Sequence, residues 1–275
     1  MEKKNHIQPF ELSIPGPGSE NTKDETITAE VLTTDDILVR PGDGREALRK
    51  ELRILILKTF PKLSKDYRDE LVSGYFDRTG NGFLRYVFLL RNQQAELIAS
   101  AMFDYGQFEY ERKPFRGIYS ILRVVSPDYE GLGLAQHMAV QEFMRFSPDV
   151  LFSTSYQSAA LHSWIRLYEK GLITGYEVFP RLEQKNGEEI LITVPFRELD
   201  FAVKSFLLSY RGFAQNEDTI TRAIRNLTVF LARKNAHGEA YEHPPWEKDG
   251  RKDALASKLG LGDQDAMLVM FRKII

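Results

Sequence analysis

The chain has 275 residues, of which 43% are hydrophobic, so it can form one large domain, or one domain with an appendage, around a substantial core. The 37 Lys and Arg residues nearly balance the 39 Asp and Glu residues, and the formal net charge is -2. The charges are mixed along the chain, which argues against a nucleic-acid partner, because such a partner requires a clustered basic face. The apolar runs fall far short of the ~20 residues that span a bilayer, so we expect no membrane contact.

The sequence contains no cysteine, and this excludes a thiol nucleophile, a disulfide framework and a cysteine metal site. The first residues, Met1 to Asn5, are not followed by the apolar stretch of a secretory signal. We therefore expect a cytoplasmic protein.

The N-terminal third predicts an arm, one strand and two helices. Residues 1–26 are rich in Pro, Gly, Ser and charge, which predicts a flexible arm. Partial alternation of apolar and polar residues predicts a strand at 27–32. Apolar residues recur at three- and four-residue steps over 44–60, and this spacing predicts a helix that Pro61 closes. A second helix is predicted at 64–76, with Ser64 as its N-cap.

Three strands and a glycine turn are predicted next. The strands are expected at 83–90, 96–103 and 118–125, and the charged connection at 109–114 predicts an exposed hairpin end. The turn at 127–135 follows the third strand directly.

Alternating helices and strands are predicted beyond the turn. Helices are expected at 133–146 and 157–170, and strands at 150–155, 175–182 and 189–194. Gly171 is a natural C-terminal residue for the second helix, and Asn186-Gly187 carries the signal of a two-residue hairpin. Residues 197–275 predict a helix at 219–233 and a final strand or helix at 266–275.

The glycine turn has the composition of an anion site. Gly131 and Gly133 have no Cβ, so their backbone amides can turn inward and approach a ligand closely. The first turn of the following helix leaves its N–H groups unpaired and adds partial positive charge. Together these features suit a pyrophosphate, although a glycine pair alone is also compatible with an ordinary strand-to-helix turn. The turn is not a P-loop, because no Lys-Ser or Lys-Thr follows, and its spacing is not that of a dinucleotide fingerprint.

The surroundings of the turn resemble motif A of the GCN5-related N-acetyltransferase (GNAT) superfamily. In that motif a strand ending in valine and proline precedes an Arg/Gln-x-x-Gly-x-Gly/Ala loop. Here Val124, Val125 and Pro127 occupy the first part, and Gly133 and Ala135 are the two small residues. The next family motif, a helix ending in a Leu-Tyr-Glu-Lys-Gly-Phe-like string, resembles Leu-Tyr-Glu-Lys-Gly-Leu at 167–172.

The resemblance implies an α/β fold with a mixed, splayed central sheet flanked by helices. It covers residues 27–196 as an acyl-CoA-binding domain and leaves 197–275 as a mainly helical C-terminal extension. It also implies acetyl-CoA as co-substrate and direct attack by an amine on the thioester. The residues expected to hold the cofactor are Arg123, Val124, Val125, Glu130, Gly131, Leu132, Gly133, Leu134 and Ala135.

The same resemblance implies catalytic residues. Tyr168 is expected to protonate the leaving thiolate, because a phenol stays protonated at neutral pH. Glu109, near the hairpin, is our choice for a general base. Glu111, Asp104, Ser120 and His162 are other options, and a water chain can replace all of them. The histidines lack metal-ligand spacing, so no metal is expected.

Two departures from the family pattern leave other functions open. Glu130 stands where Arg or Gln is usual, and a carboxylate cannot donate to a phosphate. The start of the second helix, at 155–158, has no asparagine. The alternatives are a catalytically degenerate domain that binds a ligand or partner, and an acyltransferase that uses acyl carrier protein through Arg112, Lys113 and Arg116. We expect the acceptor to be a small-molecule or peptide amine, with the extension either capping its site or forming a homodimer interface.

Overall fold

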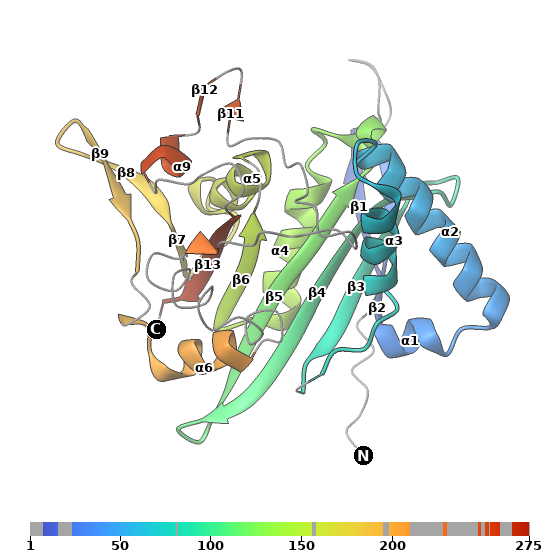
Figure 1. Ribbon diagram of the computed structural model, residues 1–275, viewed down its shortest axis with the longest axis horizontal. Helices are drawn as coiled ribbons and strands as arrows, with labels where there is room; N and C mark the ends of the chain where they lie inside the picture. The colour runs from blue at the N-terminus through green and yellow to red at the C-terminus, as the bar shows by residue number, and fades with distance from the viewer. Residues whose placement is uncertain are drawn as a thin grey trace. The chain divides into compact units, whose positions relative to one another are not determined.

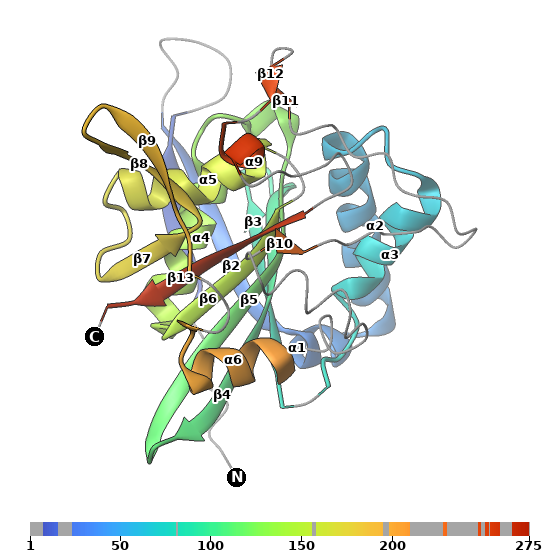
Figure 2. The ribbon, with the colours of Figure 1, turned by 60° about the vertical axis from the view of Figure 1, so that its left-hand side comes forward.

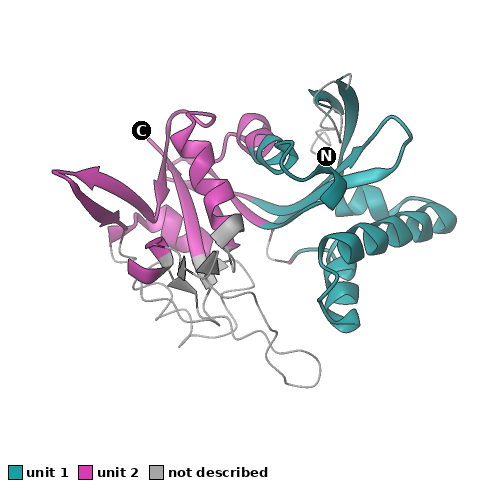
Figure 3. Cartoon of the chain, turned by 90° about the horizontal axis from the view of Figure 1, so that it is seen from above, with its two compact units in different colours: residues 1–79, 83–105, 121–139 teal, residues 80–82, 106–120, 140–275 magenta. Residues whose placement is uncertain are grey.

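The computed structural model describes most of the chain, and its helices and strands are drawn in Figure 1. The described residues are 8–15, 24–80, 82–155, 158–194, 198–209, 228–229, 247–248, 251–252, 254–258 and 266–274. The chain divides into two compact units, coloured in Figure 3. Unit 1 comprises residues 1–79, 83–105 and 121–139, and unit 2 comprises residues 80–82, 106–120 and 140–275.

Three elements run from one unit into the other along the chain. They are β4 (Leu97–Tyr110), β5 (Lys113–Val125) and α4 (Leu134–Phe146). Each matches a predicted element, although both strands are longer than expected, because the hairpin between them extends the pairing on both sides.

The sheet of unit 1 is antiparallel. β1 (Phe10–Ile14) pairs with β2 (Glu25–Thr33), β2 with β3 (Leu84–Arg91), and β3 with β4. β1 lies inside the segment that was expected to be a flexible arm, so that expectation is corrected at residues 10–14. The partner of β1 is the edge of a sheet that forms later in the chain, and local composition did not reveal it.

The helices of unit 1 are α1 (Thr34–Leu38), α2 (Gly42–Thr59) and α3 (Lys65–Gly74). The predicted apolar face of α2 is buried: Leu48, Leu52, Leu55 and Ile56 are each at most 2% exposed. They join a cluster that includes residues of α3, which lies beside α2 in Figure 1. The predicted N-cap is also confirmed, because the Ser64 hydroxyl accepts the N–H of Tyr67 at 3.2 Å.

The sheet of unit 2 is mixed, and this confirms the predicted fold class. β5 pairs in parallel with β6 (Val150–Ser155), and β13 (Ala266–Lys273) pairs antiparallel with β6 and with β7 (Tyr176–Phe179). Figure 2 shows β13 alongside β6. β13 comes from the predicted C-terminal extension, so the last strand of the extension is part of the sheet.

The parallel pairing of β5 and β6 is short. It begins at Gly117↔Val150 and ends at Ser120↔Ser153, although β5 continues to Val125. The two strands are therefore joined along only part of their length. This agrees with the splayed sheet that was predicted from the sequence.

Two local signals in the second half of the chain are confirmed. α5 (Ser158–Glu169) ends in a Schellman motif at Gly171, whose φ is +61°, with the N–H of Leu172 bonded to the carbonyl of Leu167. β8 (Arg181–Lys185) and β9 (Glu188–Ile192) form a hairpin. Its turn residues Asn186 and Gly187 both have positive φ, as a type I′ turn requires.

The predicted C-terminal extension lies largely outside the described residues. Its described elements, besides β13, are α6 (Phe201–Ser209), β10 (Thr228–Val229), β11 (Glu247–Lys248), β12 (Arg251–Lys252) and α9 (Ala254–Lys258). β10 pairs with β13, so the helix expected over 219–233 is wrong at residues 228–229. None of the helices in the described ranges has the length and low charge needed to cross a bilayer.

α6 packs directly on β5 at a glycine. A Cβ built on Gly117 would lie 2.1 to 2.4 Å from three ring carbons of Phe206. Phe206 is 1% exposed and stacks on Phe152 of β6 at 6.0 Å, so its ring has no room to move. Gly117 therefore sets how closely α6 approaches the sheet of unit 2.

We expect Gly117→Val to lower the free energy of unfolding by about 1–3 kcal/mol or more, because overpacking forces the ring and backbone apart. Urea denaturation measures this change. Gly44→Ala in α2 is the control, since its Cβ would meet nothing closer than 3.9 Å and alanine favours a helix. Equal stability of the valine variant and the native chain would contradict the contact.

Candidate functional site

The last residues of β5 present a backbone edge. Val124 is fully buried in the core of unit 1. Two residues later, Ser126 donates its N–H to the carbonyl of Ile98 in β4 at 2.8 Å. Backbone groups alternate along a strand, so Arg123 and Val125 direct theirs away from β4. The carbonyl of Val125 is held by the hydroxyl of Thr59, at the end of α2, at 3.0 Å.

The turn after β5 is built from a short 3₁₀ helix and two left-handed glycines. The 3₁₀ helix spans Pro127–Tyr129, and Glu130 closes it by donating its N–H to the carbonyl of Pro127 at 3.2 Å. Gly131 and Gly133 have φ of +81° and +82°. A side chain is strained in this region of backbone conformation, so the turn itself requires glycine at both positions.

Open space surrounds these glycines. A Cβ on Gly131 would meet nothing within 4 Å, and one on Gly133 only a carbon of His137 at 3.8 Å. Among the described residues, no acceptor within the chain bonds the N–H groups of Gly131, Gly133 or Leu134, where α4 begins. These donors, together with the positive end of the helix dipole, form a cradle for an anion.

The buried phenol of Tyr129 holds the turn through hydrogen bonds to other segments of unit 1. Tyr129 is 7% exposed, and its hydroxyl lies 3.2 Å from the amide nitrogen of Asn92 and 3.3 Å from a carboxylate oxygen of Glu25. Burial raises the pKa of Tyr129, the Asn92 bond lowers it, and the Glu25 carboxylate raises it. The phenol therefore stays neutral and fixes the turn to β2 and to the β3–β4 connection.

The side chain of Arg123 closes the other side of the turn. Its Nη1 donates to the carbonyl of Ala135 in the first turn of α4 at 3.1 Å. Sequence reasoning gave Arg123 only a backbone role, so this contact was missed. It joins the strand before the turn to the helix after it.

Two of the predicted cofactor residues have a limited part in the cradle. The side chain of Glu130 is exposed to solvent, and its N–H is used within the 3₁₀ helix. The N–H of Leu132 points to the carbonyl of Tyr129 at 3.4 Å. The donors that remain for a ligand come from Gly131, Gly133 and the start of α4.

The predicted catalytic residues lie in unit 2, whereas the turn lies in unit 1. Tyr168 is half-buried near the end of α5, and the guanidinium of Arg181 lies 5.4 Å from the centre of its ring. Arg181 is fixed by bonds to the carbonyl of Val178 and to Glu183, so a positive charge is held over the phenol. Arg181 lies near the end of the strand predicted at 175–182 and begins β8 in the structure. No pattern in the sequence indicated its contact with Tyr168.

The residues considered as general bases have different surroundings. Glu109 is exposed near the tip of the β4–β5 hairpin. Asp104 forms a buried bidentate pair with Arg85, at 2.7 and 2.9 Å. That pair ties β4 to β3, so Asp104 is not available as a base.

Ser120 belongs to a buried polar group that the sequence did not reveal. Its hydroxyl lies 3.4 Å from Oε1 of Glu142 in α4, and its carbonyl accepts the hydroxyl of Ser153 at 3.1 Å. Glu142 is fully buried. A glutamate one turn before a helix end usually faces solvent, so only the packing of α4 against β5 identifies it.

The described part of the chain contains no group of three or more His, Asp or Glu side chains arranged to hold a metal ion. The expectation that the chain holds no metal stays a prediction.

Comparison with known proteins gives matches only at the level of structure. No protein-family model matches the sequence. No curated protein matches it either.

The structure matches 132 solved chains. One is described as histone acetyltransferase HPA2 and related acetyltransferase, from Corynebacterium glutamicum. It has 12% identity and a TM-score of 0.34, and the match covers 59% of this chain and 93% of that one. A GNAT-family acetyltransferase from Staphylococcus aureus has 10% identity, a TM-score of 0.34 and coverages of 56% and 87%. An aminoglycoside acetyltransferase from a soil metagenome, in complex with sisomicin, has 12% identity and a TM-score of 0.34. That match covers 53% of this chain and 86% of the other.

The matches include GCN5-related N-acetyltransferases. This is the superfamily that the glycine turn and the Tyr168 string resemble. At these identities and TM-scores the likeness carries nothing about substrate or catalytic residues.

We expect Tyr129→Phe to lower the free energy of unfolding by about 1 kcal/mol, the usual loss for one hydrogen bond, and to loosen the turn. Amide hydrogen exchange should become faster at Tyr129 and Glu130, whose N–H groups are bonded to the carbonyls of Ser126 and Pro127 in the native turn. Tyr176→Phe is the control, because its hydroxyl donates to the carbonyl of Pro148 at 2.7 Å in unit 2. Unchanged exchange in the turn of the Tyr129 variant would show that the phenol does not support it.

Proposed function

We propose that this chain is an acyl-CoA-dependent N-acyltransferase of the GNAT kind, with acetyl-CoA as donor and an amine on a small molecule or peptide as acceptor. The observation that carries the proposal is the turn at Gly131 and Gly133. Its open, left-handed backbone precedes α4 and leaves amide donors facing free space.

Coenzyme A matches this site in two respects. Its pyrophosphate is an anion that backbone N–H groups at a helix start can bind without any particular side chain. Its pantetheine arm carries amides, and the backbone edge at Arg123 and Val125 can pair with them as a strand would. The proposal therefore assigns binding mainly to main-chain groups.

The proposed reaction is direct transfer. The neutral amine attacks the thioester carbonyl, a C–N bond forms, the C–S bond breaks, and the amine loses a proton. We assign Tyr168 as the acid that gives a proton to the leaving sulfur. The proposed base is Glu109, whose exposed carboxylate can take the proton from the amine directly or through water.

The acceptor class follows from the donor chemistry, because a thioester readily acylates an amine without a covalent enzyme intermediate. The solved structures that match include an aminoglycoside acetyltransferase in complex with sisomicin. For the present chain, small-molecule amines and peptide amines are both part of the proposal.

Glu130 favours a second candidate function, a catalytically degenerate domain that binds a ligand or partner. Its carboxylate cannot donate to a phosphate, unlike the Arg or Gln that the family motif has at this place. Titration calorimetry, which measures binding, and a thiol-release assay, which measures turnover, together separate the two candidates. Binding of acetyl-CoA with thiol release across an amine panel supports the enzyme, and binding without release supports the degenerate domain.

We expect acetyl-CoA to bind the native chain and Gly133→Val to weaken that binding by about tenfold or more, because the side chain fills the cradle and strains the turn. Titration calorimetry measures both affinities. Gly82→Val is the matched control, since Gly82 also has a positive φ, +78°, with nothing within 4 Å, but lies outside the turn. Equal loss in the two variants, or none in either, would remove the turn as the cofactor site.

We expect Tyr168→Phe to lower kcat about 10- to 1,000-fold while acetyl-CoA affinity changes little, because a general acid acts in the transition state. An assay of the thiol released over time gives kcat, and titration calorimetry gives the affinity for acetyl-CoA. Tyr105→Phe removes a phenol from β4 as a control. Native turnover in the Tyr168 variant would exclude Tyr168 as the acid.

A further inference from the structure

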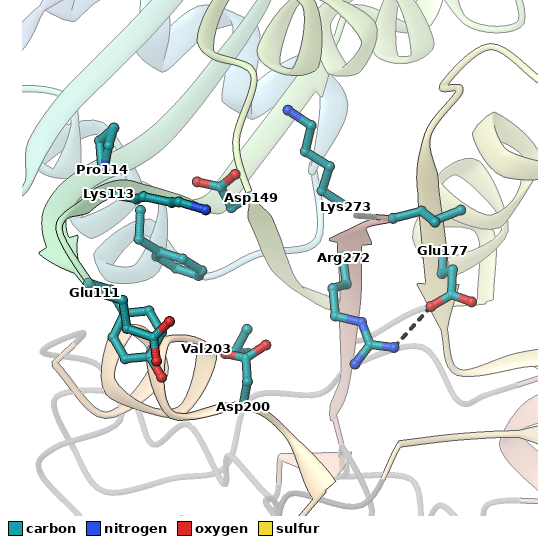
Figure 4. A pocket seen from close by; sticks show the side chains of 12 residues that line it. Glu111, Lys113, Pro114, Asp149, Glu177, Asp200, Val203, Arg272 and Lys273 are labelled. Carbon is teal, nitrogen blue, oxygen red and sulfur yellow. Dashed lines mark hydrogen bonds and ion pairs between the residues drawn. The ribbon is translucent and has the colours of Figure 1, made fainter.

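A pocket lies entirely within unit 2, and none of its lining residues belongs to the glycine turn at 127–135. Its volume is about 480 Å³, within the range of small-molecule sites. The tip of the β4–β5 hairpin and the first turn of α6 form two of its walls, and the beginnings of β6 and β7 and the end of β13 form the rest. Figure 4 shows the side chains that line it.

The pocket contains charges of both signs on an apolar lining. Glu177 and Arg272 neutralise each other through a bond of 3.0 Å. The remaining carboxylates belong to Glu111, Asp149 and Asp200, and the remaining ammonium groups to Lys113 and Lys273. Tyr110, Pro114, Phe115, Val203 and Ile274 supply the apolar surface.

Two of the carboxylates line the same pocket as the phenol of Tyr110. Desolvation raises the pKa of Tyr110, and so do the charge of Glu111, its hydrogen bond with the phenol, and the charge of Asp200. Asp200 is held in place, because its Oδ1 accepts the N–H of Val203 at 2.9 Å as the cap of α6. Its second oxygen stays available, so the group is an arranged acceptor for an ammonium ion.

An ammonium group lies across from this acceptor. In Figure 4 the side chain of Lys113 extends from the hairpin toward Asp149, on the side of the pocket opposite Asp200. The nearer carboxylate, Asp149, is engaged with the backbone N–H of Arg116 at 2.8 Å. In the described part of the chain, no carboxylate lies within 4 Å of the ammonium group of Lys113 or Lys273. Either ammonium group can therefore bind an anionic group of a ligand.

We propose that this pocket binds a small zwitterion, an amino acid or short peptide with free termini. The ammonium group lies between Glu111 and Asp200 beside the hydroxyl of Tyr110, the carboxylate lies at Lys113, and apolar side chains of the ligand contact Phe115 and Val203. A zwitterion can place an opposite charge at each of these two groups, which a simple anion or a simple cation cannot do.

The proposal does not depend on acyl transfer. Every residue in it belongs to unit 2, and its readout is binding in the absence of acetyl-CoA. A chain that fails to bind acetyl-CoA can still bind the zwitterion, and the converse also holds, so the two proposals fail separately.

The test is titration calorimetry with three probes that differ only in charge. L-leucyl-L-leucine has both termini free, N-acetyl-L-leucyl-L-leucine lacks the ammonium group, and L-leucyl-L-leucine amide lacks the carboxylate. We expect the free dipeptide to bind and each blocked form to bind about tenfold more weakly or worse, because each loses a charge-assisted bond. No binding of the free dipeptide at millimolar concentration, or equal binding of all three, would overturn the proposal.

Variants assign the binding to this pocket. Asp200→Asn keeps the cap of α6, since Asn and Asp cap helices about equally, and together with Glu111→Gln it removes the negative charge. We expect this double variant to lose affinity for the free dipeptide about tenfold or more with an unchanged melting temperature. Asp43→Asn, in the first turn of α2, is the matched control. Native affinity in the double variant would place the dipeptide elsewhere and contradict the proposal.

Discussion

The short parallel pairing of β5 with β6 is the constraint on which the other features of the site depend. Because the pairing ends at Ser120↔Ser153, the last residues of β5 have one edge without a strand partner in β6. The backbone of Val125 lies at that edge, with its carbonyl bonded to the hydroxyl of Thr59, and the glycine turn follows within a few residues. Had the pairing continued to Val125, the strand would have no backbone groups to offer a ligand.

The turn itself is specified by local chemistry, and this is why the sequence could predict it. Gly131 and Gly133 occupy backbone conformations that strain other residues, and Gly171 and Asn186-Gly187 do the same at two other turns. Ser64 at a helix start and the apolar face of α2 are equally local. Each of these signals acts within about one helical turn of sequence, so no knowledge of the fold was needed to interpret them.

The features that the sequence did not reveal depend on contacts between distant segments. β1 forms a strand because β2 offers it an edge, and β13 pairs with β6 more than 100 residues earlier in the chain. Two side-chain contacts within unit 2 follow the same rule, since Glu142 meets Ser120 and Arg181 meets Tyr168 only after helices have packed. No local signal in the sequence supports the proposed role of Glu109, which rests only on the exposure of its carboxylate in the hairpin.

Backbone recognition also explains how Glu130 can stand where the family motif has a donor. Its side chain is exposed, so water solvates the carboxylate and screens its repulsion of a nearby phosphate. The donors of the cradle are main-chain groups of Gly131, Gly133 and the start of α4, and none of them depends on the side chain at 130. In the proposed enzyme the substitution would therefore reduce the affinity for coenzyme A without removing the site. In that proposal the backbone geometry of the turn, and not the charge at position 130, would decide whether the anion binds.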